Sequence, residues 1–359
     1  MSKSELSLSS GVSMSNVRKT IRDLAGYVPG EQPQQAKFIK LNTNENPYPA
    51  SETVVSAIET AVRDLVRYPD PVAKGFRLTA APILGVDPDW ILCGNGSDDI
   101  LTILTRTFVD AGHTIRLPYP SYTLYRTLAA IQGATAEEVA FNDDWTLPTA
   151  FRSGDGQLRL VMLPNPNSPT GTVVSREEIL EIADSLPCPL IVDEAYADFA
   201  DFNCIDLVQE NEKIIVTRTL SKSYGLAGLR FGFAVAQPQV ITQMLKVKDS
   251  YNCDSLALAA ATAAICDANW LAENVAKIRA TRSRLQEQLA QLGYDVIPSH
   301  ANFVWCTHPE QPAEQIYEYL KENGILVRYM KYPKWQDGLR ISVGSDEQID
   351  ACFSLLEKQ

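Results

Sequence analysis

Short apolar runs alternate with amphipathic segments through the middle of the chain. The apolar runs are rich in Val, Ile, Leu and Phe and predict strands at residues 90–93, 113–118, 158–163, 189–192, 213–221 and 230–236. Segments with apolar residues at helical spacing lie between several of them, at 100–108, 121–132 and 175–186. Apolar strands joined by helices are typical of a parallel sheet that is covered on both faces. The pattern therefore predicts an α/β fold with a mostly parallel central sheet.

The pattern changes towards both ends of the chain. Residues 1–45 include a stretch rich in Pro, Gly and Gln and predict an arm, whose first 15 or so Ser-rich residues we expect to be disordered. Ser51 is placed to cap the helix that follows it. A long helical region at 254–292 ends at Gly293, and shorter strands and helices follow it. With 359 residues, we predict a large domain over 46–253 and a small α+β domain over 254–359.

Composition excludes several classes of function. The formal charge is −12, so the protein is a poor candidate for binding nucleic acid or an anionic membrane. Its seven cysteines form no CxxC pair, which favours reduced thiols in the cytoplasm. The three histidines lack HxxxH and HExxH spacing, so we expect no zinc site. The sequence shows no apolar run of about 18 residues and no signal-peptide core, so neither a membrane span nor secretion is expected.

Polar residues gather where the predicted strands end, which is where ligands bind in doubly wound sheets. The first strand runs into "GNGSDD" (94–99), a turn that can hold an anion before a helix or can simply cap that helix. It is not a dinucleotide fingerprint, because Asp99 stands where that motif needs Gly, and no Walker lysine follows. The loop "PNPNSPTG" (164–171) is stiffened by three prolines. It can hold Asn165 towards a ligand or be a plain turn.

Asp193 and Lys222 follow the next two strands. A carboxylate that closes an apolar strand is partly desolvated and needs a cationic partner, unless it only caps a helix. Desolvation at the rim of a crevice would disfavour the ammonium form of Lys222 and so favour an amine nucleophile. The alternative is an ordinary surface lysine. That alternative does not explain its neighbours, which are Thr219, Ser221, Gly225, Gly228 and Arg230.

Together these groups match the parts of one ligand. A phosphate suits the hydroxyls beside Arg230, a protonated ring nitrogen suits Asp193, and an aldehyde suits Lys222. Pyridoxal 5′-phosphate (PLP) carries these groups together with a phenolic oxygen. A lysine Schiff base and an acidic partner for the ring nitrogen are its usual protein signature.

The motifs also resemble those of a known family. "SKSYGLAGLRFG" (221–232) resembles the lysine signature of fold-type I, class II aminotransferases. With "LNTNENPY", "RYPDP", "GNGSDD", "PNPNSPTG" and "VDEAY", residues 20–359 resemble the histidinol-phosphate aminotransferase family. The resemblance implies the PLP-dependent transferase fold of type I and transamination between L-histidinol phosphate and 2-oxoglutarate. The products would be imidazole acetol phosphate and L-glutamate, in histidine biosynthesis.

The resemblance implies a role for each matching residue at the cofactor. Lys222 would bind PLP covalently and then move a proton between Cα and C4′, while Asp193 would pair with the pyridinium nitrogen. Asn165 and Tyr196 would hydrogen-bond the phenolic oxygen, and Tyr122 would stack on the ring. The groups that hold the phosphate would be Gly96, Ser97, Asp98, Thr219, Ser221 and Arg230.

The resemblance also implies substrate and partner residues. Arg340 and Arg328 would bind the anionic groups of the substrates, because a planar guanidinium suits carboxylate and phosphate alike. Tyr27 would cover the substrate. Tyr68 would reach the phosphate in the other subunit of a homodimer.

Two departures from the family pattern leave the substrate open. Asp99 stands where the family commonly has Glu, and "YNCDS" replaces the usual "YNVNS". The alternatives are an aromatic amino acid aminotransferase of the same fold, a phosphoamino-acid decarboxylase similar to threonine-phosphate decarboxylase, and a PLP-binding protein without catalysis. Product analysis separates the aminotransferases from the decarboxylase, because the former transfer an amino group to 2-oxoglutarate and the latter releases carbon dioxide.

Overall fold

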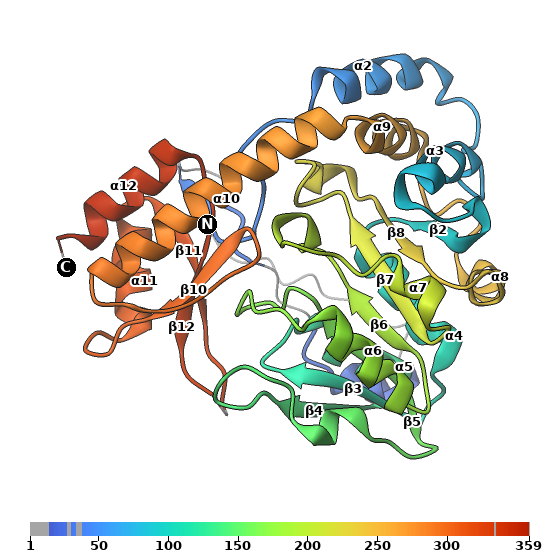
Figure 1. Cartoon of the computed structure of the whole chain (residues 1–359), viewed down its shortest axis with the longest axis horizontal. Helices are drawn as coiled ribbons and strands as arrows, with labels where there is room; N and C mark the ends of the chain where they lie inside the picture. The colour runs from blue at the N-terminus through green and yellow to red at the C-terminus, as the bar shows by residue number, and fades with distance from the viewer. Residues whose placement is uncertain (1–13, 27–29, 34–37, 334, 359) are drawn as a thin grey trace.

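The computed structural model describes residues 14–26, 30–33, 38–333 and 335–358, and two sheets organise them (Figure 1). Within these residues the larger sheet has seven strands in the order β2-β8-β7-β6-β5-β3-β4. They are β2 (Ile91–Gly94), β3 (Thr114–Tyr119), β4 (Thr135–Ala140), β5 (Leu158–Pro164), β6 (Leu190–Asp193), β7 (Ile214–Thr219) and β8 (Gly232–Val235). Strands β4, β3, β5, β6 and β7 are parallel, and β8 is antiparallel to both of its neighbours. The predicted α/β fold is confirmed.

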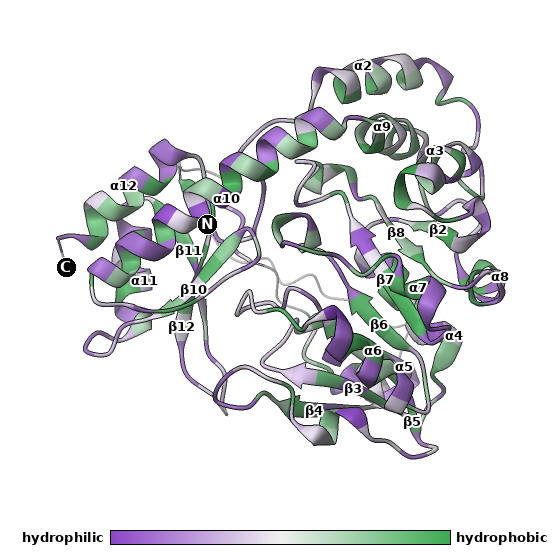
Figure 2. Ribbon diagram, in the orientation of Figure 1, coloured by the Kyte–Doolittle hydropathy of each residue, from purple (hydrophilic) through white to green (hydrophobic). Residues whose placement is uncertain are grey.

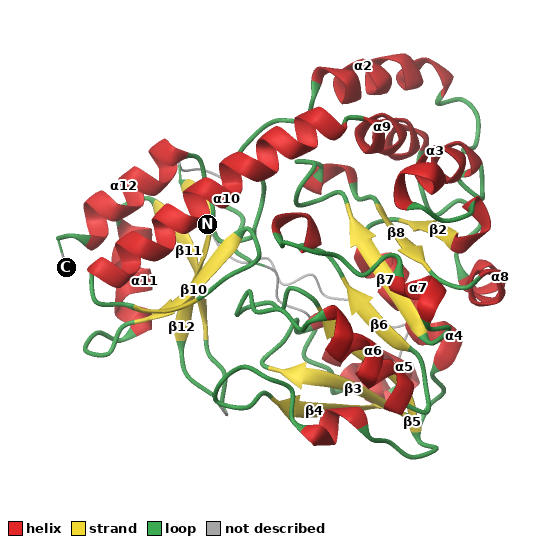
Figure 3. Ribbon diagram, in the orientation of Figure 1, coloured by secondary structure: helices red, strands yellow, loops and turns green. Residues whose placement is uncertain are grey.

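Helices cover both faces of the larger sheet (Figure 3). They are α2 (Glu52–Ala61), α3 (Lys74–Leu84), α4 (Ser97–Phe108), α5 (Leu124–Gln132), α6 (Arg176–Ser185), α7 (Leu207–Glu210), α8 (Pro238–Val247) and α9 (Ser255–Cys266). Val192 and Val216 share one core with side chains of α3, α6 and α9. Ile191 and Ile215 share the opposite core with α4, α5 and α8. Because consecutive strand residues face opposite sides, both faces must be apolar, and β6 and β8 are mostly green in Figure 2.

The smaller sheet has the order β1-β11-β12-β10-β9 within the described chain. Its strands are β1 (Ile39–Leu41), β9 (Asp295–Ile297), β10 (Phe303–Thr307), β11 (Ile325–Met330) and β12 (Gly338–Ser342). The remaining α-helices are α1 (Lys19–Arg22), α10 (Ala268–Gln291), α11 (Ala313–Glu322) and α12 (Asp346–Leu356). The last three share a core with this sheet. The domain boundaries at residues 45 and 253 stay a prediction, although β1 from the arm pairs with β11 and α9 packs against α2 and α3.

The predicted long helical region at 254–292 consists of two helices. α9 and α10 are bent by 80° at Asp267. This residue has non-helical dihedral angles (φ −91°, ψ 62°), and its side chain accepts a hydrogen bond from the main-chain N of Trp270. Asp267 therefore caps the start of α10. No single helix in the described residues is long and apolar enough to span a membrane, and α9 and α10 meet such a criterion only as this bent pair.

Two helix starts are fixed locally, one by a side-chain cap and one by a glycine. The side chain of Ser51 accepts from the main-chain N of Val54, which confirms its predicted role as the cap of α2. Helix α4 begins at Ser97, earlier than predicted, directly after Gly96 with its positive φ of 85°. The first main-chain N–H groups of α4 therefore lie just beyond the carboxyl end of β2.

Candidate active site

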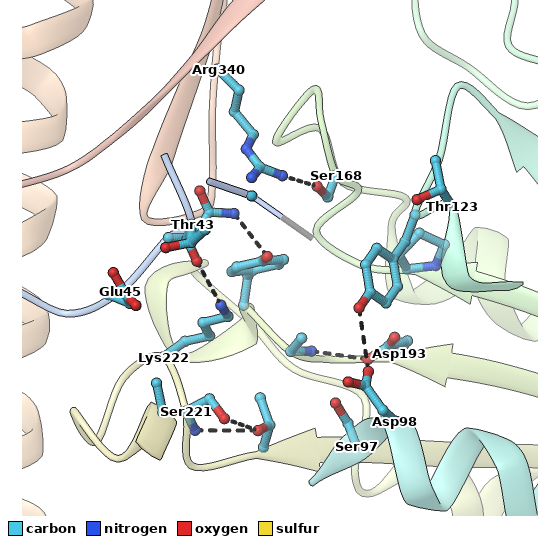
Figure 4. A pocket seen from close by; sticks show the side chains of 18 of the residues that line it. Thr43, Glu45, Ser97, Asp98, Thr123, Ser168, Asp193, Ser221, Lys222 and Arg340 are labelled. Atoms are coloured by element: carbon cyan, nitrogen blue, oxygen red, sulfur yellow. Dashed lines mark hydrogen bonds between the residues drawn. The ribbon is translucent and has the colours of Figure 1, made fainter. Parts of the chain in front are cut away.

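A cavity of about 310 Å³ lies at the carboxyl ends of the parallel strands, between the two sheets (Figure 4). Pro164, Asp193 and Thr219, the last residues of β5, β6 and β7, line it from the larger sheet. Arg328 and Arg340 line it from β11 and β12 of the smaller sheet. This is the crevice in which doubly wound sheets bind their ligands.

Lys222 lies just past the end of β7, and its side chain enters the cavity (Figure 4). Its Nζ donates to the main-chain oxygen of Thr43 at 3.1 Å and lies 5.8 Å from the ring centroid of Tyr196. Burial, and after it the positive charge of Arg340, lowers the pKa of Lys222 to about 8, although the charge of Glu45 acts in the opposite direction. A lysine with this pKa has a substantial fraction of neutral, nucleophilic amine near pH 8.

The carboxylate of Asp193 is buried and receives three hydrogen bonds. Tyr125 Oη donates to Oδ2 at 2.6 Å, Thr217 Oγ1 donates to Oδ1 at 3.1 Å, and the main-chain N of Ala195 donates to Oδ1 at 3.3 Å. Burial raises the pKa of Asp193, while the hydrogen bonds from Tyr125 and Thr217 lower it. These donors support a carboxylate anion at a place where a cationic ring nitrogen can pair with it.

The start of α4 and Arg230 form an anion-binding end of the cavity. Ser97 and Asp98, in the first turn of α4, both line the cavity. The Arg230 guanidinium lies beside them, with Nη2 at 3.4 Å from Asp98 Oδ2. A Cβ at Gly96 would lie 2.6 Å from that same Nη2, so glycine at this position lets the guanidinium approach the helix start closely. Main-chain N–H groups and a guanidinium suit a phosphate.

The end of β7 adds hydroxyl groups to this end of the cavity. Thr219 Oγ1 and Ser221 Oγ lie 3.0 Å apart, and Ser221 Oγ is 3.4 Å from Arg230 Nη1. A Cβ at Gly232, on the neighbouring strand, would lie 2.6 Å from the main-chain N of Ser97. Glycine there lets β8 approach the helix start closely.

Arg340 and Arg328 bring positive charge to the opposite side of the cavity. Arg340 Nη1 donates to Ser168 Oγ at 3.0 Å, and Nη2 donates to the main-chain oxygen of Asn42 at 3.1 Å. Its guanidinium also lies 5.3 Å from the ring centroid of Phe303. Two guanidinium groups in one cavity can hold a carboxylate or a phosphate.

The segment 42–46 reaches the lysine and the tyrosine of the site from the N-terminal part of the chain. Thr43 contributes the main-chain oxygen that accepts from Lys222. Asn44 Nδ2 donates to Tyr196 Oη at 2.9 Å. Asn46 Nδ2 donates to the main-chain oxygens of Lys222 and of the next residue, each at 3.0 Å. The segment therefore holds both the main chain and the side chain of the lysine.

Comparison with known proteins places this site in a family. The chain matches the family "Aminotransferase class I and II" over residues 36–355. It is 61% identical to a histidinol-phosphate aminotransferase of Rhodopirellula baltica, with 95% of each chain covered. The chain belongs to the histidinol-phosphate aminotransferase family. A relative with the same name from Geotalea daltonii is 45% identical over 94% of this chain and 97% of its own. The crystal structure of histidinol-phosphate aminotransferase from Sinorhizobium meliloti in complex with pyridoxal-5′-phosphate has a TM-score of 0.86 and 26% identity, covering 96% of this chain and 98% of that one.

Most of the residues predicted from the family resemblance meet in the cavity. Those that line it are Ser97, Asp98, Tyr122, Asp193, Tyr196, Thr219, Ser221, Lys222, Arg230, Arg328 and Arg340. Gly96 adjoins them through its close approach to Arg230.

Asn165 is not among the residues that line this cavity, so its predicted bond to the phenolic oxygen of the cofactor stays a prediction. Its Nδ2 donates to the main-chain oxygen of Val174 at 3.1 Å, and its Oδ1 accepts from the main-chain N of Val174 at 2.8 Å. The amide therefore clamps its own loop, as asparagine side chains in turns often do. Ser168 of the same loop lines the cavity instead.

Tyr68 does not line the cavity. Tyr68 is 81% exposed, and its ring stacks on that of Tyr251 with the centroids 4.6 Å apart. Its predicted contribution to a second subunit stays a prediction. Tyr27 lies outside the described residues, as do residues 1–13, for which we expected disorder.

Sequence reasoning missed Tyr125 and the segment 42–46 as parts of this family's site. A signal existed for each. A tyrosine on the apolar face of a helix needs a partner for its hydroxyl when it is buried, and Tyr125 finds Asp193. In "LNTNEN" every second residue is an asparagine, so an extended chain would turn these amides to one side.

Proposed function

We propose that this protein transfers the amino group of L-histidinol phosphate to 2-oxoglutarate, giving imidazole acetol phosphate and L-glutamate in histidine biosynthesis. The observation that carries the proposal is the meeting of Lys222, with its lowered pKa, and the buried Asp193 in one cavity. The 61% identical relative is named for this activity. PLP, present in the Sinorhizobium meliloti structure, would supply an aldehyde that carries the amino group and a ring that withdraws electrons from the reacting carbon.

The residues of the cavity fit PLP from end to end. The main-chain N–H groups at the start of α4 and the guanidinium of Arg230 would hold the phosphate. At the other end, Asp193 would pair with the pyridinium nitrogen. Tyr196 would donate to the phenolic oxygen, and Tyr122 would stack on the ring. Further donors to the phosphate would be the main-chain N–H groups of Ser97 and Asp98 and the hydroxyls of Thr219 and Ser221.

Lys222 would have two tasks in this reaction. Its neutral Nζ would hold the aldehyde carbon of PLP covalently, with the aldehyde oxygen lost as water. When a substrate amine occupies that carbon instead, the free Nζ would move the proton between the substrate Cα and C4′. A general acid and base works best when its pKa is close to the working pH, and the pKa of Lys222 is about 8.

Arg340 and Arg328 would bind the anionic groups of both substrates. Histidinol phosphate carries a phosphate and no carboxylate, whereas glutamate carries two carboxylates. A guanidinium forms paired hydrogen bonds with either group. Because the two substrates would occupy the same site in turn, we expect ping-pong kinetics.

We further propose a cytoplasmic homodimer in which Tyr68 reaches the cofactor phosphate of the other subunit. The support is a run of exposed apolar side chains around it, with Leu65 at 52% and Val66 at 90% exposure. Clustered exposed apolar residues are typical of interfaces. All seven cysteines are unpaired, in keeping with a reducing compartment.

The test is a steady-state assay of amino transfer to 2-oxoglutarate with L-histidinol phosphate or L-phenylalanine as donor, with carbon dioxide measured in parallel. The proposal predicts a higher kcat/KM for histidinol phosphate and no carbon dioxide. A preference for phenylalanine would assign the aromatic activity, and carbon dioxide release would assign a decarboxylase. Lys222→Ala is the control, because it should abolish turnover of every substrate.

A further inference from the structure

Asn44 joins three parts of the molecule at the wall of the cavity. It is buried, lines the cavity and has a φ of +56°, a left-handed conformation that asparagine adopts more readily than most residues. Its main-chain N donates to Ser342 Oγ of β12 at 2.8 Å, and its main-chain oxygen accepts from Asn302 Nδ2 at 3.0 Å. Its Nδ2 donates to Tyr196 Oη at 2.9 Å. Both the main chain and the side chain of Asn44 are therefore held in place.

The hydrogen bonds of Ser342 determine which atom of the Asn44 amide faces Tyr196. Ser342 Oγ accepts the main-chain N–H of Asn44, and its single proton is then left to donate to Asn44 Oδ1, 3.0 Å away. With Oδ1 occupied by Ser342, the amide nitrogen faces Tyr196, and an amide nitrogen can only donate. The Tyr196 oxygen therefore accepts this bond, and its own proton must point elsewhere.

The reverse orientation of the amide would have the opposite effect. With Oδ1 facing Tyr196, the carbonyl oxygen would take the hydroxyl proton. Two N–H groups of Asn44 would then both donate to Ser342 Oγ, whose proton would need a new acceptor. Ser342 therefore favours the orientation of the Asn44 amide in which the hydroxyl proton of Tyr196 is free to bind another acceptor.

We propose that Asn44 is a positioning residue that directs the hydroxyl proton of Tyr196 into the cavity. The proposal rests on the proposed function, in which this hydroxyl donates to the phenolic oxygen of PLP. That oxygen carries more negative charge in the deprotonated form of the bound cofactor, so a donor beside it favours deprotonation. Asn44 is therefore expected to set the pH at which the bound cofactor ionises.

The test is a pH titration of the absorbance spectrum of the PLP-loaded protein. Asn44→Asp keeps the shape of the side chain but can only accept a hydrogen bond from Tyr196 when it is ionised. We expect it to raise the spectral pKa by about one unit, as expected for losing one hydrogen bond to a charged group. Tyr196→Phe should produce a similar rise. Asn44→Gly, which suits the positive φ, should shift the spectral pKa in the same direction by less.

Double variants separate the tyrosine effect from the added charge. If Asn44 acts through the hydroxyl, most of the Asn44→Asp shift disappears in a Tyr196→Phe background, and the Asn44→Gly shift disappears entirely. Equal shifts in both backgrounds would overturn the proposal, because only a direct effect of charge or packing would then remain. Asn302→Ala is the matched control. It removes a buried amide bound to the main chain of Asn44, so we expect lower stability and an unchanged spectral pKa.

The outcomes also separate this inference from the proposed function. A native protein that forms no Lys222-dependent band with PLP would refute both. A normal band in the native protein, together with Asn44→Asp and Asn44→Gly proteins that titrate like it, would refute the role of Asn44 alone.

Discussion

Tyr125→Phe tests how the site keeps a carboxylate charged inside the protein. Tyr125 is fully buried, and its hydroxyl makes the shortest of the three hydrogen bonds to Asp193, at 2.6 Å against 3.1 and 3.3 Å. Phenylalanine keeps the ring and removes only the hydroxyl. Burial raises the pKa of Asp193, and the variant lacks the Tyr125 hydrogen bond that lowers it. The pKa of Asp193 should therefore rise, and a larger fraction of this carboxyl group should be protonated near neutral pH.

The size of the effect follows from the bond that is lost. A hydrogen bond to a charged group contributes about 1.5–3 kcal/mol, and each 1.4 kcal/mol is about tenfold in affinity. Because a protonated Asp193 cannot pair with the pyridinium nitrogen as an anion, PLP should bind Tyr125→Phe about 10- to 100-fold more weakly near neutral pH. Raising the pH re-ionises Asp193, so the ratio of the two affinities should shrink.

The assay is an equilibrium titration of PLP-free protein with PLP, followed by absorbance at several pH values. Tyr122→Phe is the matched control, because it also removes one tyrosine hydroxyl from the cavity, and that hydroxyl donates to Asp98 at 3.3 Å. It should weaken binding less and show no recovery with pH. Equal PLP affinity of Tyr125→Phe and the native protein at every pH would refute the reasoning.

Three further predictions concern the lysine, the loop and the dimer. The rate at which PLP-free protein binds PLP covalently should rise with pH through about 8, because only the neutral amine of Lys222 reacts, and a rise that comes only near the ordinary value of 10.5 would contradict its lowered pKa. Asn165→Ala should lower the free energy of unfolding by about 2–4 kcal/mol in urea denaturation, since it strands both buried main-chain groups of Val174. A changed cofactor spectrum in that variant would show instead that Asn165 contacts PLP. Mixing Tyr68→Ala with Lys222→Ala subunits should restore activity that neither variant has, because one site of each mixed dimer would be intact; no restoration would place Tyr68 outside its partner's site.

The site residues at the strand ends could be predicted from the sequence, because each strand and the polar residues after it are neighbours along the chain. The strand β6 is an apolar run that ends at Asp193, and the apolar start of β7 is followed by a cluster of hydroxyl side chains just before Lys222. Parallel strands bring such ends to one edge of the sheet, so Asp193 and Lys222 had to lie near each other. The structure adds that burial lowers the pKa of the lysine.

The other contributions depend on contacts between distant parts of the chain. Thr43 and Lys222 are 179 residues apart, and the local pattern of "LNTNEN" does not say which element it will meet. The direction of Asn165 was also beyond local reasoning, because a polar residue in a rigid loop can bind a ligand or its own main chain with equal chemistry. The break at Asp267 was missed because a capping aspartate inside a long helical pattern looks like one more polar surface position.

The central claim is that Lys222 binds PLP covalently in a site built for histidinol phosphate. The most direct measurement is the absorbance spectrum of the protein loaded with PLP, followed over time after mixing with L-histidinol phosphate or, separately, L-phenylalanine. The account predicts a cofactor band that is absent in Lys222→Ala and that histidinol phosphate converts to the amine form faster than phenylalanine does. A native protein without such a band would contradict the role of Lys222, and faster conversion by phenylalanine would contradict the substrate.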